Sequence, residues 1–394
     1  MKLLIANLGS TSFKYRLFDM TDESQLAWGG MERIGAEMSD CFVEVDGRRT
    51  DLNIAISDHS QAVQLCLDQL TDPENGCLRS ADEVAAIGFK AVLGGRYSGV
   101  QYVTPELLDS MESMNQAAPA HNPPYVAAMR LLRESFPSLP LVAAFETGFH
   151  ETIPDSSRYY AVPREWAQKF QIQKWGFHGA SHRYIGETIG KLLGREDTRV
   201  ISCHLGGSSS LCAIRNGKSV GNTLGMSPQT GLPHNNRVGD FDPFAIPIVM
   251  QKTGKTLEEV LTDLATCSGL LGLSGTSGDC RDLQESAGNG DADAQLALDV
   301  YVSEVRRHLG GMLMLLGGAD AIVFTGGIGE NSEIIRERVC HGLTDLGIHL
   351  DTEANKKVVG ECCVSAGSSQ VEIWVVPTNE EIIVARQTKE ILEV

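Results

Sequence analysis

Hydrophobic runs of strand length recur along the chain, and between them lie segments in which apolar residues return every three or four positions. The strand-like runs are LLIAN, AAIGFKAV, LVAAF, RVISCHL, AIVFTGG and VEIWVVP, and the helix-like segments include YVAAMRLLRESF and ALDVYVSEVRRHLGGMLMLL. This alternation of the two periods predicts an α/β fold built in layers. Wholly apolar runs such as AIVF indicate central strands buried on both faces, whereas the alternation in FKYRLF is typical of a hairpin arm.

One glycine- and serine-rich phrase occurs twice, as ANLGSTSFKYRLF from residue 6 and as HLGGSSSLCAIRNG from residue 204. Aligning Leu8 with Leu205 also aligns Gly9 with Gly206, and each copy lies between two strand-like runs. The repeat predicts two domains of the same kind, over residues 1–150 and 151–381. The last helix, about residues 382–394, is expected to pack back on the first domain, and residues 157–175 are expected to cross between the two.

Size, charge and cysteine usage narrow the class of protein. A chain of 394 residues is too long to fold around a single hydrophobic core and suits two domains. The net charge of −18 disfavours nucleic acid and anionic membranes as partners. There is no signal-peptide core and no long apolar run, so we expect a cytoplasmic protein. The ten cysteines are scattered without metal-ligand spacing, which favours reduced thiols.

Four loops have the composition of phosphate- or nucleotide-binding turns. Turns of glycine and hydroxyl residues, as in the repeated phrase, direct backbone N–H groups at one spot and can hold anionic oxygens. The turn FTGGIGEN (324–331) follows an apolar strand and precedes a helix, a position that suits a nucleotide phosphate or sugar. It has neither the Walker A pattern nor the dinucleotide fingerprint. The loop SGTSGDCRD carries Asp279 and Arg281, which could contact a ribose and a purine. Taken singly, each loop could equally be an ordinary turn.

Eight motifs in order resemble the acetate and propionate kinases, which belong to the actin, Hsp70 and sugar kinase superfold (ribonuclease H-like). They are NLGSTSFKYRLF, AAPAHNPP, AFETGFH, KWGFHGASHRYI, SCHLGGSSSLCAIRNGKSVGNT, GLLGLSGTSGDCRDL, FTGGIGENSEIIRERV and VPTNEEIIVARQT. The resemblance covers nearly the whole chain. It implies reversible, Mg²⁺-dependent phosphoryl transfer from ATP to a small carboxylate, giving ADP and an acyl phosphate, in a protein that is usually a homodimer.

The same resemblance implies roles for individual residues. Arg237 would stabilise charge on the phosphoryl oxygens, His178 would donate to them in the transition state, and Glu146 would complete the catalytic group. The residues implied for the carboxylate are Lys90, Val92, His121, Phe177 and Pro228. Those implied for the nucleotide are Lys14, His204, Gly206, Gly207, Ser208, Asp279, Arg281, Gly326, Gly327, Gly329 and Asn331. The metal would be held by Glu380 and Glu146, with Asn7 near the phosphate or the metal, and Glu381 and Asp240 are the competing carboxylates.

Several positions depart from the family pattern. Lys90 stands where these kinases typically have arginine, Leu93 where they have histidine and Glu146 where they have aspartate. A lysine offers a point charge on a flexible stem in place of a bidentate fork, so either the substrate is held differently or Arg96 takes over. Ala120 replaces a bulkier residue and would enlarge the pocket for the acyl chain.

These observations support an active carboxylate kinase as the first hypothesis. The second is a nucleotide-binding regulatory or catalytically impaired homologue, favoured by the departures at Lys90, Leu93 and Glu146. The third is a kinase of a different carboxylate-like acceptor.

Overall fold

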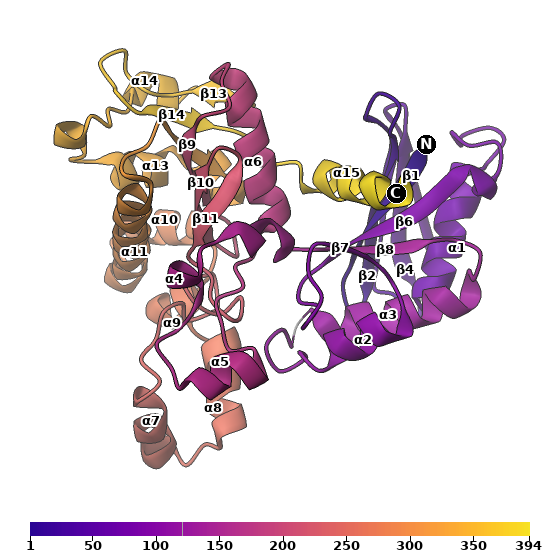
Figure 1. Cartoon of the computed structure of the whole chain (residues 1–394), viewed down its shortest axis with the longest axis horizontal. Helices are drawn as coiled ribbons and strands as arrows, with labels where there is room; N and C mark the ends of the chain where they lie inside the picture. Colours follow the sequence, from indigo (N-terminus) through magenta and orange to yellow (C-terminus); the bar gives the residue numbers. More distant parts are fainter. Residues whose placement is uncertain (120) are drawn as a thin grey trace. The chain divides into compact units, whose positions relative to one another are not determined.

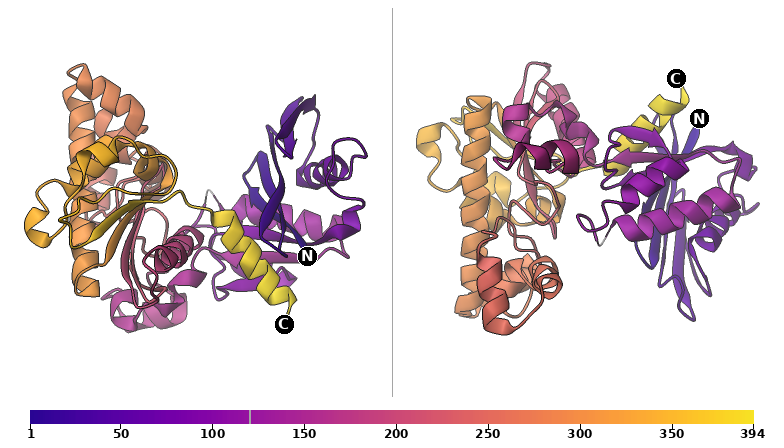
Figure 2. Two further views of the ribbon diagram at one scale, coloured as in Figure 1. Left: turned by 90° about the horizontal axis from the view of Figure 1, so that it is seen from above. Right: turned by 60° about the horizontal axis from the view of Figure 1, so that its bottom comes forward.

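The computed structural model describes residues 1–119 and 121–394, and these divide into two compact units. Unit 1 consists of Met1–Gly148 and Asn379–Val394, and unit 2 of Phe149–Thr378. Residues 157–175 therefore lie within unit 2, so the expectation that they cross between domains is wrong. Both ends of the chain lie close together in unit 1, where the last helix packs against the first strands (Figure 1, Figure 2).

Unit 1 is built on an eight-stranded mixed sheet in the order β5-β4-β3-β2-β1-β6-β8-β7. Its elements are β1 (Lys2–Leu8), β2 (Ser12–Asp19), β3 (Ser24–Glu32), β4 (Ser39–Val45), β5 (Arg48–Ile54), α1 (His59–Leu70), η1 (Ala81–Glu83), β6 (Val84–Ala91), β7 (Val100–Tyr102), α2 (Pro105–Glu112), α3 (Asn122–Ser135), β8 (Leu141–Phe145) and α15 (Glu380–Leu392).

The sheet of unit 1 is covered on both faces, as the apolar run of β1 predicts. Leu4 and Ala6 join the core formed with α1 and α3. Ile5 faces the other way with Gly88, whose missing side chain leaves room for Thr388 of α15. In β2 the alternation of FKYRLF places its aromatic and leucine side chains inside and its basic side chains outward.

Unit 2 contains a six-stranded sheet in the order β11-β10-β9-β12-β14-β13. After η2 (Gly148–Thr152), which spans the boundary, come α4 (Asp155–Arg158), α5 (Arg164–Phe170), α6 (Gly179–Leu192), β9 (Arg199–His204), β10 (Ser210–Arg215), β11 (Lys218–Asn222), α7 (Ala245–Thr253), α8 (Leu257–Thr266), α9 (Gly269–Ser274), α10 (Cys280–Gly288), α11 (Ala292–Leu316), β12 (Ala321–Thr325), α12 (Gly326–Asn331), α13 (Glu333–Cys340), η3 (Thr344–Leu346), α14 (Thr352–Asn355), β13 (Cys362–Cys363) and β14 (Glu372–Val375).

The two sheets share one connectivity, which explains the repeated phrase. In unit 1, β1 pairs antiparallel with β2 and parallel with β6, and in unit 2, β9 pairs antiparallel with β10 and parallel with β12. The two glycine- and serine-rich loops thus occupy equivalent hairpins. In unit 2, α6 covers one face of the sheet and α11 with its neighbours covers the other. The mixed α/β class expected from the sequence is confirmed.

Gly88 provides a test of how α15 docks on unit 1. A Cβ at this position would overlap Thr388 Oγ1, and the hydroxyl of Thr388 cannot turn away without losing its 2.7 Å hydrogen bond to the Val384 carbonyl. We expect Gly88→Ala to destabilise unit 1 by about 1–3 kcal/mol through overpacking. Differential scanning calorimetry measures the change.

The matched control is Gly288→Ala at the end of α10, where an added Cβ meets nothing within 4 Å. It should leave stability unchanged or raise it by up to about 1 kcal/mol, because alanine favours helix. Equal melting curves for Gly88→Ala and the wild type would contradict this account of α15.

Candidate active site

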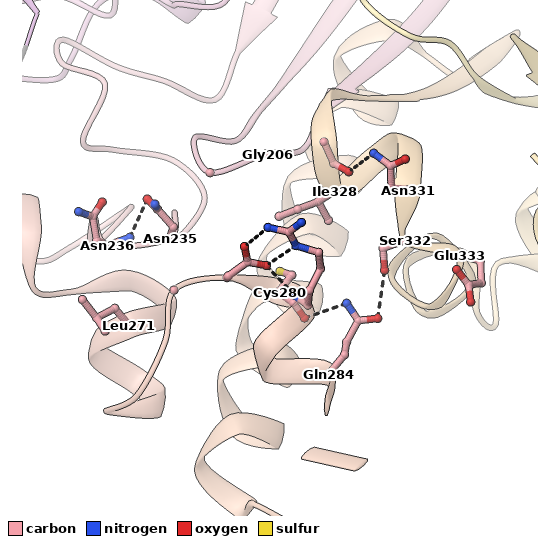
Figure 3. Close-up of a pocket in the computed structure, with 15 residues that line it drawn as sticks. Gly206, Asn235, Asn236, Leu271, Cys280, Gln284, Ile328, Asn331, Ser332 and Glu333 are labelled. Atoms are coloured by element: carbon pink, nitrogen blue, oxygen red, sulfur yellow. Dashed lines mark hydrogen bonds and ion pairs between the residues drawn. The ribbon is translucent and has the colours of Figure 1, made fainter. Parts of the chain in front are cut away.

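A cavity of about 790 Å³ in unit 2 is formed by the three glycine-containing loops of this unit that the sequence singles out (Figure 3). It is lined by Gly206, Gly207, Asn235, Asn236, Leu271, Gly278, Asp279, Cys280, Arg281, Gln284, Gly327, Ile328, Asn331, Ser332 and Glu333. Its size suits a nucleotide-sized ligand. Loops that lie about 70 and 50 residues apart in the sequence converge here because the strands and helices that carry them meet at one end of the sheet.

Six of the residues implied for the nucleotide line this cavity: Gly206, Gly207, Asp279, Arg281, Gly327 and Asn331. Gly326 and Gly329 instead lie buried beneath it. Gly326 has φ of +76°, and a Cβ there would lie 2.8 Å from the Leu205 carbonyl oxygen, so the turn requires glycine. Sequence reasoning missed Asn235 and Asn236, whose lead segment LPHNN carries no recognisable nucleotide motif.

The N-terminus of α12 is already occupied by protein groups. The amides of Ile328 and Gly329 donate to the Leu205 carbonyl at 2.8 and 3.0 Å, and the Gly326 amide donates to the Glu330 carboxylate at 2.8 Å. A carboxylate at this position also repels phosphate. Of the two ligand groups considered for FTGGIGEN, a sugar therefore fits better than a phosphate.

Asp279 and Arg281 bind each other at the edge of the cavity. Arg281 donates from Nε to Asp279 Oδ1 at 3.0 Å and from Nη2 to Asp279 Oδ2 at 2.6 Å, and Asp279 also caps α10. The guanidinium is 88% exposed, so it can turn toward a ligand at little cost.

His178 and Arg237 belong to unit 2 as well. His178 precedes α6 in the left-handed region, with φ of 57°, a conformation rare for a side chain of this size and often found at functional sites. Its ring stacks on that of His204 with centroids 4.3 Å apart, and Ser181 contacts His204 Nδ1 at 2.8 Å. His204 and Ser208, which were also expected to bind the nucleotide, lie on either side of Gly206 and Gly207 but do not line the cavity.

Arg237 is a half-buried cation. It donates to the Pro228 carbonyl at 2.8 Å, and burial lowers its pKa to about 10, so it stays protonated near neutral pH. No carboxylate lies within ion-pair distance of Arg237 in the described part of the chain. A desolvated guanidinium in that setting is suited to an anionic ligand. Phe177 and Pro228, both expected to line the acyl pocket, are buried in the same unit.

Lys90, Glu146 and Glu380 form a cluster of charges in unit 1. Lys90 is the second-to-last residue of β6, Glu146 directly follows β8, and Glu380 is the first residue of α15. The Lys90 ammonium forms an ion pair with Glu380 and lies 3.4 Å from Glu146 Oε1. Burial alone would lower the pKa of Lys90, but the two carboxylates raise it well above its usual range. The cluster thus holds one fixed positive charge between two acidic groups.

Tyr125 links Asn7 to this cluster, and sequence reasoning missed it. Its hydroxyl donates to Asn7 Oδ1 at 2.9 Å and accepts from the Leu8 amide at 3.1 Å. Burial raises the pKa of Tyr125 to about 12, and the charges of the cluster also act on it. Because Oδ1 of Asn7 faces Tyr125, its amide nitrogen is turned the other way as a donor. Tyr125 lies one helical turn after His121, the one sequence signal that could have drawn attention to it.

The remaining residues expected around the carboxylate and nucleotide are placed as follows. Lys14 pairs with Glu32 at 3.2 Å on the exposed side of the hairpin. His121 is the N-cap residue of α3, and Val92 is half-buried after β6. Leu93 is buried in unit 1, while Arg96 stacks its guanidinium on Tyr97. The expectation about residue 120 lies outside the described residues.

Two carboxylates, those of Glu380 and Glu146, meet at the Lys90 ammonium. Within residues 1–119 and 121–394, no three or more histidine, cysteine, aspartate or glutamate side chains are arranged to hold a metal ion. Mg²⁺ needs fewer, because it keeps several waters and binds through one or two carboxylates plus phosphate. The competitors are engaged elsewhere: Asp240 accepts from Arg307 at 3.2 Å, and Glu381 lies 3.8 Å from Arg16.

A two-unit α/β protein with a nucleotide-sized cavity and separate clusters of cationic and acidic groups has the features of a phosphotransferase. The chain matches the model of the Acetokinase family over residues 2–386. It is 42% identical over 388 residues to an acetate kinase of Anoxybacillus flavithermus, covering 98% of this chain and 97% of the relative. An acetate kinase of Clostridium botulinum is 42% identical over 394 residues, covering 99% of each chain.

Solved structures agree with these relatives. The Porphyromonas gingivalis acetate kinase has a TM-score of 0.90 at 35% identity and covers 99% of both chains. A propionate kinase from Francisella tularensis has a TM-score of 0.90 at 30% identity and covers 98% of both. The chain belongs to the acetokinase family, as its motifs predicted, and is a kinase whose acceptor is a carboxyl group. Nothing in the comparisons favours a regulatory homologue.

Gly327 allows the cavity to be tested without disturbing the fold. It lines the cavity, and a Cβ added there meets nothing within 4 Å. We expect Gly327→Val to fill ligand space and weaken the binding of Mg-ATP at least about tenfold, equivalent to 1.4 kcal/mol. Isothermal titration calorimetry measures the affinity.

Gly367→Val serves as the control, since this glycine also has open space around it but lies outside the cavity lining. It should bind Mg-ATP like the wild type. Unchanged affinity in Gly327→Val would show that the nucleotide binds elsewhere.

Proposed function

We propose that this protein transfers the γ-phosphoryl group of ATP to a short-chain carboxylate with the help of Mg²⁺, forming an acyl phosphate and ADP reversibly. The main support for this proposal is that acetate and propionate kinases match this chain along essentially its whole length. Acetate and propionate, for which those relatives are named, are the first candidates for the acceptor. Unit 1, the N-terminal acetokinase domain, would handle the carboxylate, and unit 2 the nucleotide.

The acidic groups in unit 1 are suited to a metal. Lys90 offers its ammonium to the carboxylates of both Glu146 and Glu380. Carboxylates repel an incoming carboxylate, and a bound cation reduces that repulsion. Bound Mg²⁺ would neutralise phosphate and cluster charge together. Glu380 and Glu146 would hold it, and the charge of Lys90 would then be available to the acceptor carboxylate.

Asn7 suits the phosphoryl group better than the metal. Its Oδ1 accepts from Tyr125, so its NH₂ group is the part left to donate, and donors stabilise phosphoryl oxygens. Asn7 would thus bind phosphate while Glu380 binds the metal.

In unit 2, the half-buried Arg237 would neutralise negative charge on the transferring group, and His178 would donate a hydrogen bond to its oxygens. Phosphoryl transfer depends on such positioning and electrostatic stabilisation more than on covalent chemistry by the protein. Phe177 and Pro228 of this unit would contact the apolar part of the acceptor. The nucleotide would lie in the cavity, with Gly206, Gly207 and Asn331 near it.

Two further expectations concern location and assembly. All ten cysteines are free thiols, which supports a reducing compartment and hence the cytoplasm. None of the helices in the described part of the chain has the length and apolar character needed to span a bilayer. The helical pair α7 and α8 exposes Phe244, Ile248, Leu257 and Leu261 by 49–82%. Such an apolar surface suits association, and we infer a homodimer, as the family resemblance implies.

The activity is tested by a hydroxamate assay with Mg-ATP and carboxylates of one to six carbons, comparing the wild type with Lys90→Arg and Lys90→Met. We expect product with one or two short acids from the wild type. Lys90→Met should lose about a hundredfold or more in kcat/KM, because two carboxylates are left without their cation. Lys90→Arg keeps the charge and should lose less.

The outcomes separate the three hypotheses. A folded wild type that binds Mg-ATP but phosphorylates none of the acids would refute the carboxylate kinase and favour the regulatory homologue. If Lys90→Arg alone is active, the acceptor of the wild type is a different one.

The assembly is tested by sedimentation velocity. Phe244→Glu places a charge on a side chain that is 82% exposed, and we expect it to convert dimer to monomer. Val359→Glu is the control, since Val359 is 88% exposed on a different segment. A wild-type monomer, or a dimer unaffected by Phe244→Glu, would contradict the assignment of this surface.

A further inference from the structure

Two serines and two histidines form a hydrogen-bonded chain that ends on His178. Ser202 Oγ lies 2.9 Å from His182 Nδ1, and His182 Nε2 lies 2.8 Å from Ser210 Oγ. Ser210 Oγ in turn lies 2.8 Å from Nδ1 of His178. Ser202, Ser210 and His182 are completely buried, so water does not supply alternative partners. The direction in which this chain donates its protons decides which nitrogen of His178 carries hydrogen.

Ser202 determines the direction in which this hydrogen-bonded chain donates its protons. Its buried hydroxyl has one partner among residues 1–119 and 121–394, the His182 ring, so it must donate to Nδ1 or leave an O–H unsatisfied. A buried donor without an acceptor costs about 1–3 kcal/mol. The chain therefore favours Ser202 as donor and Nδ1 of His182 as acceptor.

The remaining steps follow from the number of protons available. Burial, reinforced by His150 and His204, holds the pKa of His182 well below its usual range, so this ring is neutral and carries one hydrogen. With Nδ1 accepting, that hydrogen is on Nε2 and is donated to Ser210 Oγ. The single hydrogen of Ser210 then points to Nδ1 of His178. A neutral His178 whose Nδ1 accepts carries its own hydrogen on Nε2.

We propose that Ser210 and His182 are positioning residues that hold His178 as the Nε2–H tautomer, the form that can donate to a phosphoryl oxygen. This inference rests on the role given to His178 under the proposed function. The opposite tautomer would present a lone pair at Nε2 to an anionic oxygen, which is repulsive. The stacked ring of His204 and the left-handed backbone of His178 restrict the ring's orientation, so the serine chain has only to set the proton.

The tautomer can be read directly by ¹H–¹⁵N correlation spectra of the full chain labelled at histidine, in which His178→Gln identifies the resonances of His178. In the wild type we expect hydrogen on Nε2 and none on Nδ1. Ser210→Ala removes the donor to Nδ1, so the spectrum should show a mixture of tautomers. In the same variant kcat should fall about 10- to 100-fold, the usual range for an outer partner of a reacting group, with KM for ATP unchanged.

Ser202→Ala and Ser219→Ala complete the design. Ser202→Ala removes only the residue that sets the direction, so it should also mix the tautomers of His178, with a smaller loss of kcat. Ser219 is a buried serine whose hydroxyl contacts a different ring, His150 Nδ1, at 2.8 Å. Ser219→Ala deletes the same kind of bond and should leave the His178 tautomer unchanged.

An Nδ1–H tautomer of His178 in the wild type, or an unchanged spectrum and kcat in Ser210→Ala, would overturn the inference. The spectra decide this independently of turnover. If the wild type is inactive on every carboxylate yet shows the Nε2–H form that Ser210→Ala disrupts, the proposed function fails while the positioning by Ser210 stands.

Discussion

The ion cluster of Lys90, Glu146 and Glu380 is the interaction on which the arrangement of unit 1 depends. It joins three segments that lie far apart in the sequence, and Glu380 is the first residue of α15. Removing three charges from water is costly, and a buried pair that loses one partner is destabilised by about 3–5 kcal/mol. The same charges that constrain where α15 begins are thus the ones a metal and a carboxylate would meet.

In unit 2, hydrogen bonds satisfy the polar groups at the start of α12 and on the buried histidine rings. The Leu205 carbonyl and the Glu330 carboxylate accept hydrogen bonds from the amides at the start of α12, and serine hydroxyls bind the nitrogens of two buried histidine rings, His150 and His182. These bonds fix the loops around the cavity before any ligand arrives. Preorganised donors cost no reorganisation at the moment of reaction, which is why they are effective around a transferring phosphoryl group.

Much of the fold could be predicted from the sequence, because the spacing of apolar residues and the composition of each segment indicate which residues are buried. The apolar runs became the central strands, and the duplicated phrase marked two hairpins with equivalent connectivity. The crossing between units was misplaced because residues 157–175 combine polar and aromatic residues in a pattern that does not distinguish a linker from short helices on a surface. Glycines were assigned to the nucleotide by motif, but the motif does not distinguish Gly327, which lines the cavity, from Gly326, which the turn itself requires.

The residues that escaped prediction share a physical reason. Tyr125 lies in an ordinary amphipathic segment, and Ser202 and Ser210 lie in a quoted motif that does not single them out; only their hydrogen bonds to Asn7, His182 and His178 give them a role. A motif records the groups that meet a substrate, whereas the groups that orient them are specified by packing across strands. Lys90 and Glu146 stand where the family pattern has arginine and aspartate, and these two side chains form an ion pair with each other. The two departures are therefore best considered jointly. Changes that would be damaging one at a time are compatible with function when the two side chains that meet change together.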